Sequence, residues 1–225
     1  ANKILLLTRT TPKDQCKKST EGMTLFYTDL DKEQIEVRRI PKMGRNAVDS
    51  NAVFIDDFFI PDEDRIGEEG QGFKYILHSL NPERILIGAE AIGLGQNALD
   101  RAAKYAQERE VFGRPIGQNQ GIQFPIARAH VNIEAADLMR IRAAELFDGG
   151  HPCGAEANMA KLLAADASWE AANVTMQTYG GFGFAQEYDI ERKFRETRLY
   201  QTAPISTNLI LSYIGQHVLD LPRSF

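Results

Sequence analysis

Apolar and polar residues recur with different periods in the two parts of this chain. Up to about residue 65, short runs of β-branched, leucine and aromatic residues are separated by turn residues, which predicts strands at 3–10, 23–28, 35–38 and 51–60. Residues 35–38 alternate with period two, as a half-buried strand does. Four short strands of this kind predict an antiparallel sheet, or part of a sandwich or barrel.

From Gly72 onward the pattern becomes helical. Apolar residues at spacings of three and four predict helices at about 81–109, 124–148 and 155–179, and a last one from about 206. Asn81-Pro82-Glu83 has the form of a helix start, with a capping residue, a proline at the first helical position and an acid in the first turn. Gly149-Gly150 is expected to end the second helix and Gly180-Gly181 the third, the latter through a left-handed cap.

The expected fold class is therefore α+β by segments, a partial antiparallel β-domain followed by an up-and-down four-helix bundle. The polar, glycine-rich stretch at 67–72 marks the boundary. We assign residues 1–66 to the β part and 67–225 to the helical bundle.

Composition excludes several function classes. The net charge of -5, without a basic block, gives no electrostatic footprint for nucleic acid. The apolar runs are too short for a membrane span. The two cysteines and four histidines lack the spacing of a disulfide framework or a metal site, so we expect a reducing intracellular compartment and no metal.

General catalytic motifs are missing from the sequence: it has no G-x-S-x-G, Walker or H-E-x-x-H pattern. The glycine-rich stretch 180–184 follows a helix rather than a strand, so by itself it indicates a helix end and a tight turn. Residues 109–115 are equally explained as a helix end with a basic residue. These patterns alone predict an architecture and no activity.

Three longer motifs nevertheless resemble those of acyl-CoA dehydrogenases. They are Tyr105-x-x-x-Arg109-x-x-Phe112-Gly113-x-x-x-x-x-Asn119-Gln120, Gln177-x-x-Gly180-Gly181-x-Gly183-Phe184 and the linker Pro61-x-x-x-x-Ile66-Gly-x-x-Gly70-x-Gly72-Phe73. A fourth short segment, Gly93-Leu94-Gly95-Gln96, falls where the family's first bundle helix carries a similar sequence. The order and spacing of all four agree with the family over nearly the whole chain.

The resemblance implies three domains, of which this chain holds the second half of the middle β-domain and the whole C-terminal bundle, without the N-terminal helical domain. It implies FAD as cofactor, an acyl-CoA substrate, electron-transferring flavoprotein as electron acceptor and a homotetramer built as a dimer of dimers. By position it implies the following cofactor-binding residues: Arg109, Val111, Phe112, Asn119, Gln120, Gln177, Gly180, Gly181, Ser206 and Asn208. Asn119 stands where the family more often has histidine.

The same resemblance directs attention to the catalytic base, which removes the α-proton of the thioester while hydride passes to flavin N5. Many members place a glutamate in a Y-E-G-T-S-Q motif, and the corresponding position here is Pro204, which has no basic group. Other members place the base on the first bundle helix, where Glu83-Arg84 stands in this chain. Glu83 is thus the expected base, with Asn81 and Arg84 beside the substrate, although a first-turn acid that stabilises its helix would look the same.

Three alternatives to a dehydrogenase remain open at this point. A non-catalytic flavin-binding paralogue or scaffold subunit would account for Pro204, a flavin monooxygenase or oxidase would share the fold, and a helical interaction module would bind no flavin. The expected location is the cytoplasm of a bacterium or the mitochondrial matrix of a eukaryote.

Overall fold

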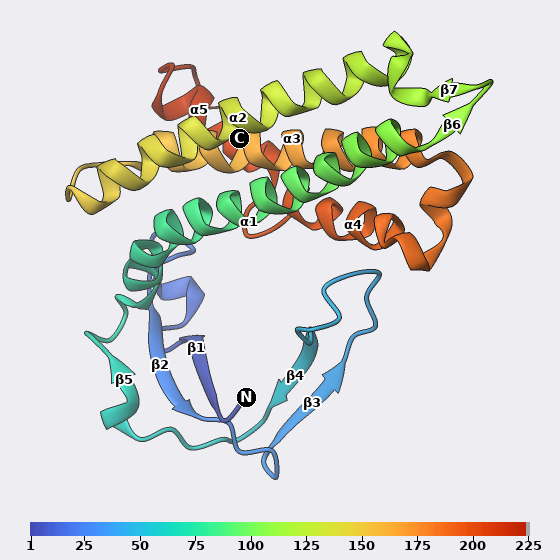
Figure 1. Ribbon diagram of the computed structural model, residues 1–225. Helices are drawn as coiled ribbons and strands as arrows, with labels where there is room; N and C mark the ends of the chain where they lie inside the picture. The colour runs from blue at the N-terminus through green and yellow to red at the C-terminus, as the bar shows by residue number, and fades with distance from the viewer. Residues whose placement is uncertain (224–225) are drawn as a thin grey trace. The chain divides into compact units, whose positions relative to one another are not determined.

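The computed structural model describes residues 1–223, which divide into two units, one from Ala1 to Leu80 and one from Asn81 onward. The strands of the first unit follow the predicted pattern (Figure 1). β1 (Lys3–Arg9), β2 (Met23–Asp29) and β5 (Arg65–Ile66) form an antiparallel sheet in the order β1-β2-β5. β3 (Ile35–Arg39) pairs separately with β4 (Asn51–Ile55) in antiparallel register. The first three predicted strands are confirmed to within one residue, the fourth is shorter than predicted because it ends at Ile55 rather than at residue 60, and β5 is an addition of two residues.

Five α-helices follow: α1 (Gly72–Glu108), α2 (Gln120–Asp148), α3 (Gly154–Tyr179), α4 (Ile190–Thr197) and α5 (Thr207–His217). A short hairpin of β6 (Glu110–Val111) and β7 (Arg114–Pro115) joins α1 to α2 (Figure 1). The predicted bundle is confirmed, and its second and third helices lie within a few residues of the predicted ranges. The last helix begins near residue 206 as predicted, and Ser206 caps it, since its Oγ accepts from the amide of Leu209.

The predicted start of the first helix is wrong. α1 begins at Gly72, and Pro82 lies inside the helix. Residues 73–81 contain no glycine or proline, so nothing in them ends a helix, and the helix tolerates the missing amide of one proline. The division into two units also falls within α1. Glu83 is therefore not a first-turn acid, and the stabilisation expected from a helix N-terminus does not apply to it.

The three long helices pack closely because alanine lines their contact faces. One buried cluster joins residues of α1, α2 and α3, among them Ala91, Leu99, Ala129, Ile133, Ala136, Ala164 and Ala171, with Tyr200 of the 3-10 turn Arg198–Gln201. A side-chain carbon on Gly95 of α1 would lie 2.7 Å from Ile133 Cδ1 and 3.0 Å from Ser168 Cα. Small residues thus set the distance between these helices.

The glycines that end the helices behave differently from one another. Gly150 has φ +69, which supports the predicted stop after α2. Gly180 also has positive φ (57), but its ψ of -132 lies outside the left-handed helical region, so the predicted left-handed cap is wrong in form. Only glycine adopts this conformation without strain, and it turns the chain directly into the 3-10 turn Gly180–Phe184.

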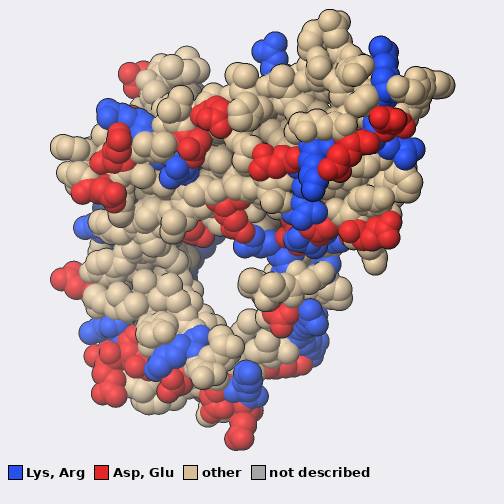
Figure 2. Space-filling view, viewed as in Figure 1, with Lys and Arg blue, Asp and Glu red and all other residues tan. Residues whose placement is uncertain are grey.

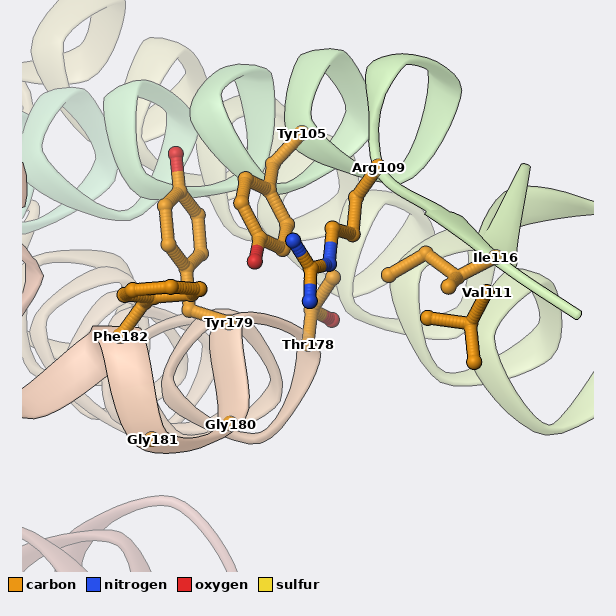
Figure 3. A pocket seen from close by; sticks show the side chains of 9 residues that line it. All are labelled: Tyr105, Arg109, Val111, Ile116, Thr178, Tyr179, Gly180, Gly181 and Phe182. Atoms are coloured by element: carbon orange, nitrogen blue, oxygen red, sulfur yellow. The ribbon is translucent and has the colours of Figure 1, made fainter.

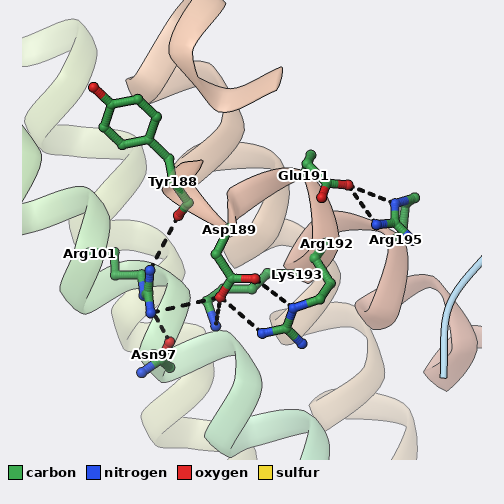
Figure 4. Close-up of polar contacts among 8 residues, drawn as sticks. All are labelled: Asn97, Arg101, Tyr188, Asp189, Glu191, Arg192, Lys193 and Arg195. Atoms are coloured by element: carbon green, nitrogen blue, oxygen red, sulfur yellow. Dashed lines mark hydrogen bonds and ion pairs between the residues drawn. The ribbon is translucent and has the colours of Figure 1, made fainter. Parts of the chain in front are cut away.

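α4 was not predicted, because it has only eight residues and its sequence is dominated by charge, with Ile190 and Phe194 as its apolar residues. Its start is held by Asp189, which has φ +61 and binds Arg192 through two hydrogen bonds of 2.5 and 2.9 Å (Figure 4). Asp189 also contacts Lys193 and, across the bundle, Arg101 of α1. Arg192 holds the pKa of the Asp189 carboxyl below its usual range. Ion pairs that include Arg101, a residue distant in sequence, therefore stabilise a helix that the local sequence does not predict.

Two surface properties bear on function. Acidic and basic side chains are interspersed on the face shown in Figure 2, without a continuous basic area. Within residues 1–223, no helix is long and apolar enough to cross a membrane, and no group of metal-binding side chains comes together.

Candidate functional site

A cavity of about 440 Å³ lies between the C-terminal ends of α1 and α3 (Figure 3). α1 contributes Tyr105, and Arg109 follows its last residue. The turn after α3 contributes the backbone of Gly180 and Gly181. The remaining lining residues are Val111, Ile116, Thr178, Tyr179 and Phe182.

A second cavity of about 450 Å³ adjoins the first, because Val111 and Ile116 line both. Its other lining residues are Phe112, Arg114, Asn119, Gly121 and Ile122, from the β6–β7 hairpin and the start of α2. Six of the ten residues predicted to bind the cofactor therefore line these two cavities: Arg109, Val111, Phe112, Asn119, Gly180 and Gly181. Segments about 70 residues apart in the sequence meet here.

Aromatic rings hold the ends of α1 and α3 together beside the first cavity. Tyr105 and Tyr179 stack with ring centroids 4.1 Å apart and planes 16° apart. Tyr188 meets both rings edge-on. The Tyr179 hydroxyl donates to the main-chain oxygen of Arg101 at 3.3 Å, and burial raises the pKa of that hydroxyl, so it stays protonated at neutral pH. These rings fix the width of the cavity.

Arg109 is the cationic group of the first cavity. Its guanidinium lies over the Phe182 ring, 5.5 Å from the centroid, while the rest of the side chain is exposed. The main-chain oxygen of Arg109 accepts from the amide of Ile116 at 2.8 Å, which closes the hairpin base. A planar, permanently charged fork in this setting is suited to a phosphate or pyrophosphate group.

Phe112 occupies the tip of the hairpin in an unfavourable conformation. It has φ 54, the following Gly113 has φ 74, and the Phe112 side chain is 100% exposed. Two consecutive positive φ values define the tight hairpin turn that prefers Asn-Gly. An aromatic ring held fully in solvent by a strained backbone indicates a residue selected to contact something else.

The chemistry of the two cavities fits a dinucleotide. One guanidinium is available for the phosphates, and Val111, Ile116 and Phe112 offer apolar contacts for a ring. At Gly180 and Gly181 an added side-chain carbon would meet nothing within 4 Å, so the main chain faces open space that a ligand can approach.

The residues predicted to contact the substrate lie elsewhere in the helical unit. Glu83 is exposed on α1, and Arg84 is half-buried and donates from Nη1 to Asn81 Oδ1 at 2.9 Å. Burial lowers the pKa of the Arg84 guanidinium, and Tyr213 of α5 and Glu83 oppose that change. The Tyr213 hydroxyl and the Asn81 amide also lie near Gly154, where an added carbon would meet them at 2.8 and 3.9 Å. Three helices therefore meet here: α1 near Asn81 and Arg84, α3 at its first residue Gly154, and α5 at Tyr213.

The structure does not bring all the predicted residues together within one chain. A separation of 25 residues between Glu83 and Glu108 on α1 corresponds to roughly 38 Å along the helix axis. The Glu83 region and the Arg109 region of one chain therefore lie far apart, near opposite ends of the second part of α1.

Four predicted cofactor residues lie outside the two cavities. Gln120 and Gln177 are exposed in the terminal turns of α2 and α3, next to cavity residues. Ser206 and Asn208 lie at the start of α5. Sequence reasoning missed Ile116, Thr178, Phe182 and Tyr213; the first three fall inside or directly between the motif positions, whereas no sequence signal indicated Tyr213.

Comparison with known proteins agrees with this arrangement. Residues 70–219 match the family model described as acyl-CoA dehydrogenase, C-terminal domain. The chain is 41% identical over 208 residues to acyl-CoA dehydrogenase fadE12 of Mycobacterium bovis, covering 92% of this chain and 51% of that protein. It is 35% identical over 189 residues to the caffeyl-CoA reductase-Etf complex subunit CarC of Acetobacterium woodii, covering 84% and 50%. The chain spans about half the length of the curated relatives it matches.

Solved structures show the same fold. The glutaryl-coenzyme A dehydrogenase glutaryl-CoA complex aligns with a TM-score of 0.93 and 30% identity, over 100% of this chain and 56% of that one. The FAD complex of PigA aligns with a TM-score of 0.90 and 25% identity, over 97% and 56%. Family model, relatives and fold coincide with the motifs and their geometry, and the chain belongs to the acyl-CoA dehydrogenase family.

Proposed function

We propose that this chain supplies part of the active site of an FAD-dependent acyl-CoA dehydrogenase, which introduces a double bond between the α- and β-carbons of an acyl-CoA thioester. The observation that carries the proposal is the meeting of six motif residues at the two adjoining cavities. A similar fold binds FAD in the PigA complex, and another holds glutaryl-CoA in its dehydrogenase.

Within the cavities, each group has a distinct role. Arg109 would neutralise the pyrophosphate of FAD, Val111 and Phe112 would offer apolar contacts to its rings, and the open main chain at Gly180 and Gly181 would allow its close approach. Asn119 donates from Nδ2 to the main-chain oxygen of Ile116 and accepts from Arg114, so it holds the second cavity's wall in place.

At the other end of α1, Glu83 is the proposed base. Its carboxylate accepts the α-proton of the thioester, and the electron pair of that C–H bond becomes part of the new double bond. FAD, when bound, supplies the acceptor for the β-hydrogen as hydride. Arg84, held by Asn81, orients the carboxylate and the acyl chain.

The separation of the two regions supports a role for a second copy of the chain. If both contact FAD, the Arg109 region of one subunit completes the site that contains Glu83 of another. This supports a homo-oligomer, a dimer of dimers by resemblance. Electron-transferring flavoprotein is the proposed acceptor, since a relative is a subunit of an Etf complex. The proposed location is the bacterial cytoplasm or the mitochondrial matrix.

A flavin-binding subunit without dehydrogenase activity is the second candidate. The observation that favours it is Pro204, which stands where many members carry the catalytic glutamate.

The decisive experiment is anaerobic bleaching of bound FAD in the protein at its natural length, with a panel of straight and branched acyl-CoAs. Wild type and Glu134→Gln, an exposed acid on α2, should bleach with one class of thioester. Glu83→Gln should bind FAD equally and bleach at least a thousandfold more slowly. Equal bleaching by Glu83→Gln would refute the base assignment, and bound FAD that no thioester bleaches would favour the second candidate.

The cofactor site has its own test. Arg109→Gln should weaken FAD binding about tenfold or more, because a charged hydrogen bond to phosphate contributes about 1.5–3 kcal/mol. Arg128→Gln removes an exposed arginine of α2 that lines neither cavity and should leave FAD binding unchanged. Equal FAD affinity in both variants would refute the role of Arg109.

A further inference from the structure

Lys161 of α3 is among the most deeply buried side chains of the described residues, with 1% exposure. Its ammonium donates to two main-chain oxygens, those of Tyr200 at 2.5 Å and Ile205 at 2.7 Å. Burial lowers the pKa of Lys161 to about 8, with Asp166 opposing that change. Among the described residues it forms no ion pair, so the two carbonyls are its main compensation for burial.

A buried lysine lowers the stability of the fold relative to an apolar side chain of the same size. Removing an ammonium group from water carries a large desolvation cost, which hydrogen bonds only partly offset. A methionine of similar length would pack at this position without that cost. The charge is therefore better explained by the carbonyls that it holds than by packing.

The two carbonyls bracket one short loop. Tyr200 lies in the 3-10 turn Arg198–Gln201, and Ile205 directly precedes Ser206, the cap of α5. Between them, the side-chain Nε2 of Gln201 donates to the main-chain oxygen of Ala165 at 3.1 Å and to Asp166 Oδ1 at 3.0 Å, both on α3. α3 thus binds the loop 200–206 through three of its residues, Tyr200, Gln201 and Ile205. Lys161 makes the contacts to Tyr200 and Ile205.

We propose that Lys161 is a positioning residue, which holds loop 200–206 against α3 and thereby sets the position of Ser206, Thr207 and Asn208 at the active site. This inference rests on the proposed function, because the loop stands where the family's other catalytic glutamate lies and leads into the predicted FAD residues Ser206 and Asn208. With proline at position 204, the loop has no acid to contribute. Its remaining contribution is the placement of the α5 start.

Three variants separate positioning from general stability. Lys161→Met keeps the volume and removes both hydrogen bonds, whereas Lys161→Arg retains a cationic donor. Thr175→Val is the matched control, because Thr175 is fully buried on the same helix and its hydroxyl bonds only within α3, to Ala171 O.

The readout is amide hydrogen exchange in the protein at its natural length, together with FAD retained per chain. In Lys161→Met, residues 198–209 should exchange at least tenfold faster while α2 and the rest of α3 stay as in wild type. Lys161→Arg should restore exchange to within threefold, and Thr175→Val should not loosen the loop. FAD retention should fall in Lys161→Met alone.

Two outcomes would overturn the inference. Unchanged loop exchange in Lys161→Met would do so, as would an increase shared equally by α2, α3 and the loop. Failure of the proposed function is distinguishable, since wild type itself would then retain no FAD or fail to bleach with any acyl-CoA, whatever the loop does.

Discussion

The Arg84 guanidinium donates through Nη1 to Oδ1 of Asn81 at 2.9 Å, one helical turn earlier on α1 and across Pro82. The pair therefore lies where proline removes one amide donor from the helix interior. It fixes a half-buried cation next to Glu83, whose side chain projects from the same turn. The Asn81–Arg84 contact thus places a cation within electrostatic reach of the proposed catalytic glutamate.

Asn81→Ala should lower the free energy of unfolding by about 1 kcal/mol, because it leaves a half-buried guanidinium without this acceptor. Asn81→Asp retains the acceptor and should remain close to wild type. Chemical denaturation of the three proteins measures the difference. An Asn81→Ala protein as stable as wild type would mean that water replaces the amide oxygen fully.

Gly95 and Gly93 form a matched pair on α1 for testing close helix packing. Gly95→Ala should destabilise by about 1–3 kcal/mol, since its new carbon would meet Ile133 and the Ser168 backbone. Gly93 has nothing within 4 Å, so Gly93→Ala should stabilise by up to about 1 kcal/mol through helix propensity. Thermal unfolding of both variants should show shifts of opposite sign, and shifts of the same sign would contradict the packing argument.

Phe112→Asn should raise stability and weaken FAD binding together. Asparagine suits the positive φ of this hairpin turn, and the change should add about 0.5–1 kcal/mol. Loss of the ring should reduce FAD affinity, because Phe112 lines the second cavity. The ring is fully exposed in the chain, so its apolar surface is free to contact a ligand. Unfolding midpoints without FAD and titration with FAD measure the two effects. A loss of stability would mean that the exposed ring supports the fold.

Asp189→Asn should cost about 1–2 kcal/mol, since asparagine tolerates the left-handed backbone but loses the charge that binds Arg192 and Lys193. Because Arg192 depresses the pKa of Asp189, its contribution is present above the unfolded pKa near 3.8 and is lost as pH falls through the folded value. The variant should therefore differ from wild type at pH 7 and converge with it in acid.

Glu191→Gln breaks the i,i+4 pair with Arg195 and should cost only about 0.5 kcal/mol.

Lys161 predicts a pH effect of the same sign as that of Asp189, but in an alkaline window. Its folded pKa of about 8 lies below the ordinary value of 10.5, so the unfolded chain binds the proton more tightly between these values. The free energy of unfolding should consequently rise with pH between 8 and 10.5, relative to Lys161→Met. Denaturation at several pH values tests this, and parallel curves for the two proteins would contradict a buried, titrating lysine.

Sequence reasoning recovered the elements whose signals are local. The strands and the second and third helices follow directly from the spacing of apolar residues. α1 was cut short because Asn81-Pro82-Glu83 has the composition of a helix start, although nothing before it ends a helix. α4 was missed because contacts with Arg101, far away in sequence, stabilise it.

The site was recovered in part for a similar reason. Motifs identified Arg109 and Gly180, but only the folded chain shows that the Tyr105 and Tyr179 rings stack beside them. The proximity of Tyr213 to Arg84 depends on how α5 returns to the bundle, which no spacing along the chain encodes.

The alanine-lined contact between α1 and α3 has a consequence for how the protein tolerates change. Both helices run in the same direction and end at the first cavity, so a change in their spacing should also shift the Tyr105 and Tyr179 rings that set the width of that cavity. Ala91 of α1 and Ala164 of α3 belong to the same buried cluster, so a larger side chain at either position should push the two helices apart. Substitutions at these positions, although far from the cavity, should therefore change cofactor affinity before they unfold the chain. We expect only alanine or glycine to be accepted there.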